Sequence, residues 1–447
     1  MSSTENNTIK ASSRVTWEGC SVVLDIDTKN GHRLDFARLT PAASLSHDHK
    51  NYSLKPLIGC PFGTVFQLDT SSDHAPFLSP FQPKGNNVNN IEEIKDDRES
   101  RDNRSLIDNN TAQTLTAEDI QHMRRQGAKG DDIVEAVIAN SATFHKKTSF
   151  SQEKYIDKKQ KKHAPRVLMR RPVARSICEA YIKKNLLKIG FLRVDTLSLL
   201  LSMANVSSNS DVLVVDMVGG LLTGAVAERL GGTGFVCNSY LGQTPHAMDI
   251  VNLFNLSDEI RKRIVRSSIS DLLSPKESPQ QNSKQDVGSV ESQSIDQMSV
   301  SVSMEEASRL PENRISDLGA ENTTFPVLKA HKAIKAGEKA SQEILNSWKE
   351  NGFSSLIIAA LDLDTWTVVR DLLPLLSNSA PFAIYHQYLQ PLATCMHNLQ
   401  LEKLAIGLQI TEPWLREYQV LPSRTHPHMK MSAFGGYILS GTKICSS

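Results

Sequence analysis

The stretch DVLVVDMVGGLLTGAVAERLGGTGFVCNSY, residues 211–240, decides the fold. DVLVVD is a short apolar run ending in a carboxylate, which is typical of a buried parallel strand. Small and apolar residues at helical spacing follow over residues 222–230, and Gly231-Gly232 ends that helix. GFVCNSY then returns as a second strand, so the sequence predicts a βαβ unit that begins a doubly wound sheet.

The turn after the first strand departs from the pattern that binds a nucleotide-like cofactor. Such turns place glycines two residues apart, so that the backbone turns sharply and approaches the ligand. At those positions this chain has Val218, Gly220 and Leu222. Val218 is β-branched and disfavours positive φ, and Leu222 puts a bulky side chain where a ligand would lie. Asn238 stands where an acid would hold the ribose, so we predict a degenerate cofactor loop.

Composition sets wide limits on the kind of protein. The 447 residues suffice for two or three domains, and 50 Lys and Arg nearly balance 49 Asp and Glu. The six cysteines form no CxxC pair, which excludes a zinc ribbon and suggests reduced thiols in an intracellular protein. The first residues are polar, and no apolar run approaches membrane-spanning length. We therefore expect a soluble protein without membrane contact.

Short alternating segments separated by turn residues occupy residues 14–70 and predict a small N-terminal β-barrel. Within them, SVVLDID and HRLDFARL flank Asn30-Gly31, which is a hairpin signal. Residues 71–100 are rich in Pro, Asn and Ser and are predicted to be a linker. Residues 101–165 predict a basic helical connector of three helices. The first follows a capping box from Thr116 to Asp119, the second begins near Asp132, and the third covers about 151–164.

The third of these helices, SQEKYIDKKQKKH, carries a local electrostatic signal. Its lysines at i, i+4, i+7 and i+8 share one face: Lys154, Lys158, Lys161 and Lys162. Residues 145–188 hold 14 Lys or Arg and only three Asp or Glu, in a chain of net charge +1. A lysine-rich face is often merely solvated, but this excess, continued by Arg166, Arg170 and Arg171, favours binding of RNA phosphates.

Alternating β and α segments over residues 166–447 predict a Rossmann-like domain. A helix begins after Pro172, Asp195 is expected to cap the next, and another helix is expected near 257–267. Residues 270–324, rich in Ser, Gln and Glu, are expected to be a disordered insertion. The segments resemble the class I methyltransferase sheet, seven-stranded with one antiparallel strand. The predicted fold class is thus α/β plus all-β.

Other polar constellations are weak. His47-Asp48-His49 and His426-Pro427-His428 lack helical HxxxH spacing and a partner cluster, so we predict loops without a metal. Asp362 and Asp364 end a strand at the carboxyl edge of the predicted sheet, where such folds place residues that contact the substrate and where a catalytic role is conceivable. Carboxylates in a turn before a helix are more often helix caps, and we expect that role here.

Three runs together are similar to the non-catalytic subunit of eukaryotic tRNA (adenine-58, N1) methyltransferase. They are IGCPFGTVFQLD, the connector from RDNRSLIDNN through KKQKKHAPRV, and the C-terminal EPWLREYQVLPSRTHPHMKMSAFGGYILSG. The resemblance implies a β-barrel, a Rossmann-like domain and a nuclear location. It implies a tight pairing with a catalytic paralogue, with two copies of each subunit in the enzyme. It also implies that S-adenosylmethionine and the catalytic acid belong to the partner. It further suggests tRNA contacts at the basic connector and at Arg424, whose forked donors suit phosphate.

Two other functions stay open from the sequence. One is an active S-adenosylmethionine-dependent RNA methyltransferase with a divergent loop. The other is a translation-factor-like RNA-binding module without a methyltransferase partner. We expect the non-catalytic, tRNA-binding subunit, with no cofactor, metal or catalytic residue in this chain.

Overall fold

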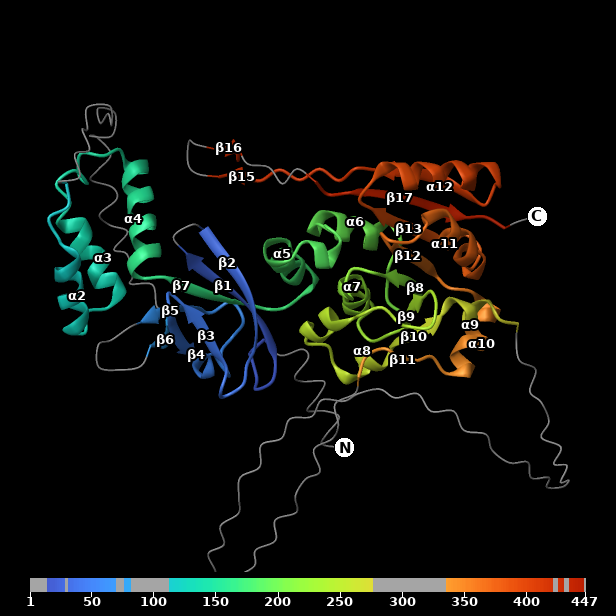
Figure 1. The fold of residues 1–447 in the computed structure, drawn as a ribbon, viewed down its shortest axis with the longest axis horizontal. Coiled ribbons are helices and arrows are strands. Elements are labelled where there is room, and N and C mark those ends of the chain that lie inside the picture. Colours follow the sequence, from blue (N-terminus) through green and yellow to red (C-terminus); the bar gives the residue numbers. More distant parts are fainter. Residues whose placement is uncertain are drawn as a thin grey trace, which may run out of the picture. The chain divides into compact units, whose positions relative to one another are not determined.

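The computed structural model describes residues 14–28, 31–69, 76–81, 112–275, 335–420, 425–429 and 434–445. They include two main β-sheets, a group of three helices and a helical layer on each face of the larger sheet. Figure 1 gives the element labels used below.

The larger sheet has eight strands in the described residues, in the order β11-β10-β9-β8-β12-β13-β17-β14. All neighbours are parallel except β17, which is antiparallel to both β13 and β14. The strands are β8 (Asp211–Asp216), β9 (Phe235–Tyr240), β10 (Ile264–Ser268), β11 (Glu338–Lys339), β12 (Ser355–Ala359), β13 (Pro381–His386), β14 (Ala405–Thr411) and β17 (Tyr437–Lys443). The predicted Rossmann-like methyltransferase sheet is confirmed, with the two-residue edge strand β11 as an eighth member.

Helices cover both faces of this sheet, which is why its strands are apolar along their whole length. The four valine and leucine residues inside β8 are all completely buried. One face packs against α5 (Ala174–Lys184), α6 (Val194–Met203) and α7 (Leu221–Leu230). The other packs against α9 (Ile269–Leu273), α10 (Gln342–Asn351), α11 (Thr365–Leu372) and α12 (Leu389–Leu401).

The N-terminal part forms an open five-stranded sheet in the described residues, in the order β2-β1-β7-β5-β6. Neighbouring strands are antiparallel throughout. A separate hairpin packs its buried Leu45 and Tyr52 into the same core. Because β2 and β6 are unpaired edges among the described residues, the predicted closed barrel is not confirmed. The strands are β1 (Ser21–Thr28), β2 (Gly31–Arg38), β3 (Ser44–His47), β4 (Lys50–Ser53), β5 (Val65–Asp69), β6 (Phe77–Pro80) and β7 (Arg166–Arg170).

Two of these strands lie outside the segment that the sequence assigned to the barrel. Strand β6 falls within the predicted linker, and it pairs with β5 so that Phe66 lies opposite Pro80 and Asp69 lies opposite Phe77. Strand β7 falls at the predicted start of the Rossmann-like domain, yet it lies between β1 and β5 in the N-terminal sheet. Its Val167 and Met169 are completely buried in the core of that sheet. The remaining domain limits stay predictions.

The connector contains the three predicted helices. They are α2 (Ala117–Arg125), α3 (Gly130–Ala139) and α4 (Ser149–His163). The predicted capping box is present: the Thr116 hydroxyl accepts from the Asp119 amide at 3.2 Å, and the Asp119 carboxylate accepts from the Thr116 amide at 2.9 Å. Helices α3 and α4 pack on each other, and Gly130 permits this because a Cβ there would lie 2.8 Å from the Ala164 side chain.

Three local predictions for the Rossmann-like part were wrong. The helix expected near 257–267 is only α8 (Asp258–Lys262), because the β-branched run that follows pairs in the sheet as β10. Asp195 does not cap α6: the N-cap is Arg193, and the Asp195 carboxylate instead pairs with the Arg193 guanidinium. The start predicted for the insertion, residue 270, is too early, because residues 269–273 form the helix α9. Residues 276–324 of the predicted insertion lie outside the described part of the chain.

Candidate functional site

Asp216, at the end of β8, occupies the position from which this fold usually holds a cofactor. Its carboxylate is completely buried and accepts four hydrogen bonds from the turn that follows. One oxygen accepts from the amides of Val218 (2.9 Å) and Gly220 (3.2 Å). The other accepts from the Thr223 amide and hydroxyl, both at 2.8 Å. The acceptor capacity of this acid is therefore used within the turn.

The turn obtains its left-handed residues from two adjacent glycines, Gly219 (φ 73°) and Gly220 (φ 90°). Val218 is not left-handed, so the expected conflict between its branched side chain and a positive φ does not arise. Val218 and Leu222 are both completely buried in the core cluster on this face of the sheet. The turn is locally well formed, although it lacks the alternating glycines of a cofactor loop.

The space over these glycines is taken by the chain itself. A Cβ at Gly220 would lie 2.7 Å from the Met248 Cα, and one at Gly219 would lie 2.9 Å from the Ile250 side chain. The Ile250 amide also donates to the Gly219 carbonyl at 3.1 Å. In a cofactor-binding turn, glycine lets the ligand approach the backbone. Here glycine lets the segment that begins the 3-10 helix η5 (Asp249–Leu253) do so.

Asn238, at the end of β9, is 2% exposed and is also used internally. Its amide donates to the Thr223 hydroxyl at 3.2 Å and contacts the Met248 sulfur. A ribose would need a free acceptor at this position. The residues of this site therefore do not fit S-adenosylmethionine.

At the carboxyl edge of the sheet, Asp364 is a helix cap. Its carboxylate accepts from the Thr367 amide at 2.8 Å and hydroxyl at 2.7 Å at the start of α11. The hydroxyl bond is the main reason that the pKa of Asp364 is lowered. Asp362 is exposed. The prediction of a capping role is confirmed for Asp364.

The lysine face of α4 is present in the structure. Lys154, Lys158 and Lys162 are exposed, and the structure gives none of them an acidic partner among its described residues. Lys161 is less exposed (24%) and pairs with Asp157 at 2.8 Å, one helical turn before it. Three uncompensated ammonium groups at i, i+4 and i+8 thus follow one line along the helix. Their contact with RNA stays a prediction.

Residues that the sequence analysis missed extend this surface. The ammonium groups of Lys147 and Lys159 lie 4.6 Å and 5.1 Å from the centre of the Tyr155 ring. Phe144 packs against the same ring at 5.7 Å between centres. The signal was the tyrosine interleaved with lysines, which is typical of nucleic-acid surfaces because aromatic rings stack on bases.

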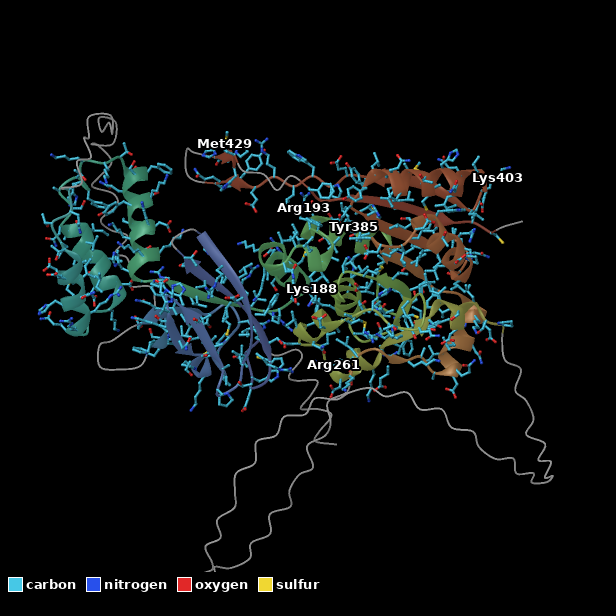
Figure 2. All side chains as sticks on the ribbon, viewed as in Figure 1. Lys188, Arg193, Arg261, Tyr385, Lys403 and Met429 are labelled. Carbon is cyan, nitrogen blue, oxygen red and sulfur yellow. The ribbon has the colours of Figure 1, made fainter. Side chains whose placement is uncertain are left out.

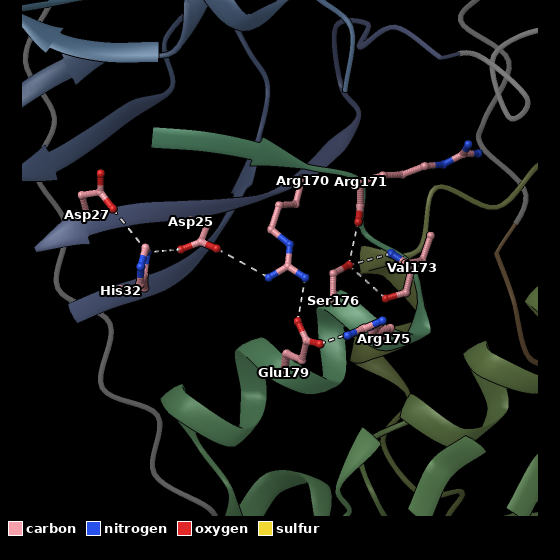
Figure 3. A network of polar contacts seen from close by, with 9 residues as sticks. All are labelled: Asp25, Asp27, His32, Arg170, Arg171, Val173, Arg175, Ser176 and Glu179. Atoms are coloured by element: carbon pink, nitrogen blue, oxygen red, sulfur yellow. Dashed lines mark hydrogen bonds and ion pairs between the residues drawn. The ribbon is translucent and has the colours of Figure 1, made fainter. Parts of the chain in front are cut away.

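Arg170 differs from the lysines because its donors are engaged inside the protein. Figure 3 shows its guanidinium between two carboxylates, Glu179 of α5 at 2.6 Å and Asp25 of β1 at 3.6 Å. Glu179 also binds Arg175, at 2.9 Å, and Asp25 lies 3.2 Å from His32. Arg170 therefore connects the N-terminal sheet to α5.

The other two arginines predicted to contact RNA are Arg171 and Arg424. Arg171 is exposed, with its guanidinium 6.0 Å from the Phe62 ring centre. Arg424 lies outside the described residues. Contacts of Arg170, Arg171 and Arg424 with tRNA stay predictions.

A segment between β14 and β17, residues 412–436, is held at its base by α6; we call it the arm. Arg193 is buried and donates to the Pro413 carbonyl at 2.9 Å, while the Thr196 hydroxyl donates to the Gly435 carbonyl at 2.8 Å. Figure 2 labels Arg193 and, near the end of the arm, Met429. The described part of the arm exposes large apolar side chains: Trp414 (69%), Tyr418 (53%), Val420 (75%), Met429 (93%) and Phe434 (42%). Such a concentration is typical of a protein interface.

Neither a metal centre nor a membrane span is found in the described part of the chain. No group of three or more His, Cys, Asp or Glu side chains there is arranged to hold a metal ion. None of the described helices has the length and apolarity needed to cross a bilayer.

The sheet order and the filled turn define the class: a Rossmann-like protein of the methyltransferase type whose cofactor position is occupied by its own chain. The chain belongs to the Gcd10p family, whose model matches residues 18–299. It is 32% identical to the tRNA (adenine(58)-N(1))-methyltransferase non-catalytic subunit of Dictyostelium discoideum, over 98% of this chain and 81% of the relative. The subunit of the same name from Mus musculus is 31% identical, over 77% of this chain and 74% of the relative.

Solved structures give more distant similarity. A SAM-dependent O-methyltransferase from Thermotoga maritima matches with a TM-score of 0.48 at 10% identity, over 98% of each chain. The tRNA (m1A58) methyltransferase TrmI from Aquifex aeolicus matches with a TM-score of 0.44 at 12% identity, over 97% of this chain and all of that one.

Proposed function

We propose that this chain is the non-catalytic, tRNA-binding subunit of a tRNA (adenine-58, N1) methyltransferase. The observation that carries the proposal is the contact of Met248 and Ile250 with Gly220 and Gly219, which fills the position of the cofactor. The relatives that match most of this chain bear the name of that non-catalytic subunit. The alternative of an active enzyme with a divergent loop is disfavoured, because binding would require this segment to leave a buried position.

The catalytic subunit is the proposed partner, in a two-plus-two assembly. The support is the exposed apolar surface of the arm; Ile406 (59% exposed) on β14 and Leu401 (66%) at the end of α12 are further exposed apolar side chains on this part of the chain. Obligate interfaces are more apolar than the rest of a protein surface. Bound to its partner, this chain would hold the partner's active site in position and complete the surface for RNA.

The proposed RNA surface is the lysine face of α4 with Tyr155. Lys154, Lys158 and Lys162 have no acidic partner in the described residues, so phosphates would not have to displace an ion pair. Lys147 and Lys159 add charge around an aromatic ring. A nuclear location is part of the proposal, and fluorescence microscopy of the tagged chain would check it.

The decisive experiment measures methylation of a tRNA transcript by this chain alone, by the catalytic subunit alone and by both together. We expect activity only with both. Titration calorimetry of this chain with S-adenosylmethionine should show no binding. Methylation by this chain alone, or a micromolar dissociation constant for the cofactor, would overturn the proposal.

A further inference from the structure

A cavity of about 400 Å³ lies where strands β5 and β6 face the turn between α2 and α3 and the end of α4. This volume is within the range of ligand pockets, about 300–1,000 Å³. The cavity is distinct from the lysine face, since it is lined by the last residue of α4, His163, and by none of the four lysines. It is also far along the chain from the filled cofactor turn.

The cavity has an apolar floor with one accessible aromatic ring. Leu68 and Ile133 are 5% and 1% exposed, so they form a fixed wall. Phe77 of β6 is 43% exposed, which is unusual for a phenylalanine that lines a cavity. A flat ring with a free face is the feature on which nucleic-acid bases stack.

Two cations border this floor. Arg124, in the last turn of α2, and Lys129, the N-cap residue of α3, both line the cavity. No carboxylate among the described residues lies within ion-pair distance of either side chain. Lys129 stands at the N-terminus of the ten-residue helix α3, whose dipole also favours an anion, and Arg124 borders the same cavity from the end of α2. A phosphate is therefore the group that this border would bind best.

One acceptor completes the cavity. The Asp69 carboxylate accepts from the Ser79 hydroxyl, which fixes its position, and has further lone pairs to offer. A carboxylate beside an aromatic ring accepts from a ribose hydroxyl or from the amino group of a base.

From these groups we infer that the cavity binds a single unpaired nucleotide of the RNA, with its base on Phe77 and its phosphate between Arg124 and Lys129. The inference rests on the proposed function, because it takes the RNA as the source of the nucleotide. The basic helix α4 supports that source: its lysine face leads along the chain to His163 at the cavity. A free nucleoside monophosphate shares this chemistry, so the test has to separate the two sources.

The test uses the full chain with two probes: a fluorescein-labelled single-stranded RNA of about ten nucleotides and adenosine 5′-monophosphate. Phe77→Leu keeps the apolar bulk but removes the stacking face, and should weaken binding of the RNA about tenfold without changing its salt dependence. Phe77→Trp should keep wild-type binding. Arg124→Ala should weaken binding and reduce the slope of log K against log salt by about 0.7.

Each result is informative about one of the two proposals. If the wild-type chain binds the RNA and both Phe77→Leu and Arg124→Ala bind it equally well, the nucleotide pocket is wrong and the lysine face stands. If adenosine 5′-monophosphate binds as tightly as the RNA, the pocket serves a free nucleotide and its assignment to RNA is wrong. If the wild-type chain does not bind the RNA at all, the pocket falls together with the RNA surface. Unchanged thermal midpoints of the variants verify that each has folded.

Discussion

Replacing Asp216 by alanine would test whether this acid serves the turn or a ligand. The variant leaves the buried amides of Val218, Gly220 and Thr223 without their acceptor. An unsatisfied buried donor costs about 1–3 kcal/mol, and relaxation of the turn recovers part of this. We expect Asp216→Ala to lower the free energy of unfolding by about 3–6 kcal/mol.

Asp216→Asn is a sharper variant of the same change. Asparagine keeps one acceptor oxygen, but its NH₂ group then faces either the Val218 and Gly220 amides or the Thr223 amide, all of which are donors. The loss should be about 2–4 kcal/mol, even though size and shape are kept.

Urea unfolding followed by circular dichroism measures both variants, with Asp362→Ala as the matched control. Asp362 also follows a strand of the same sheet but is exposed, so its removal should change stability by less than about 0.5 kcal/mol. If Asp216→Ala costs less than about 1 kcal/mol, the carboxylate is not needed by the turn, and the argument that its bonds are used internally fails.

Four further outcomes are expected. Arg193→Ala should destabilise the chain by about 2–4 kcal/mol, because it leaves Asp195 and the Pro413 carbonyl without their shared partner, and Arg193→Lys should recover only part of this in the same unfolding assay. Burial raises the pKa of Glu228, which means that the folded chain favours the protonated side chain. The contribution of protonated Glu228 to stability is full below the unfolded pKa of about 4.3 and is lost as pH rises through the folded pKa. Glu228→Gln, which stays neutral, should therefore raise the thermal midpoint at pH 7 but not at pH 4. A maleimide should label the native chain first at exposed Cys445 and more slowly at half-buried Cys60, and it should reach the buried thiols only after unfolding. Burial raises the pKa of one of these buried thiols, Cys178, to about 12, which suppresses the reactive thiolate. Mass spectrometry measures the labelling, and rapid labelling of four or more cysteines in the native chain would contradict the described core. The last variant changes four lysines of α4 to alanine: Lys154, Lys158, Lys161 and Lys162. It should weaken tRNA binding by the assembled complex and flatten the slope of log K against log salt by about 0.7–0.9 for each lysine that binds a phosphate, whereas the matched Lys→Arg variant should keep both the affinity and the slope. An unchanged slope in the alanine variant would mean that this face is merely solvated.

The Rossmann-like sheet was predictable because its strands carry local signals. DVLVVD and GFVCNSY are apolar and bounded by turns, so they form β8 and β9 as expected. IVRSS was missed because it follows α8 with no Gly or Pro between them, and its pairing with β9 decides its conformation. RVLMR was missed for a related reason: its two terminal arginines, Arg166 and Arg170, continue the basic connector in the sequence, while its buried face is defined only by β1 and β5.

The candidate site likewise has features that the local sequence predicts and features that depend on residues far away in the sequence. The exposed lysines of α4 follow from helical spacing alone, because i and i+4 side chains share a face whatever the helix contacts. The filling of the cofactor turn depends on Met248 and Ile250, which no pattern around residue 218 reveals. The sequence therefore predicted a poor cofactor loop but not its occupant. The internal ion pairs of Arg170 were equally hidden, since Asp25 lies in a strand far away in the sequence.

The position of β7 has a consequence for synthesis of the chain. Because β7 lies between β1 and β5, a nascent polypeptide that ends before Arg166 has these two strands without their common neighbour. The N-terminal sheet can close its hydrogen-bond ladder only after α2, α3 and α4 have left the ribosome. The connector is thus an insertion within one cooperative folding unit, and the long loop it closes should slow folding of that unit. A fragment truncated at residue 165 should expose the apolar edges of β1 and β5 and aggregate, whereas one that extends through Arg170 supplies the missing strand.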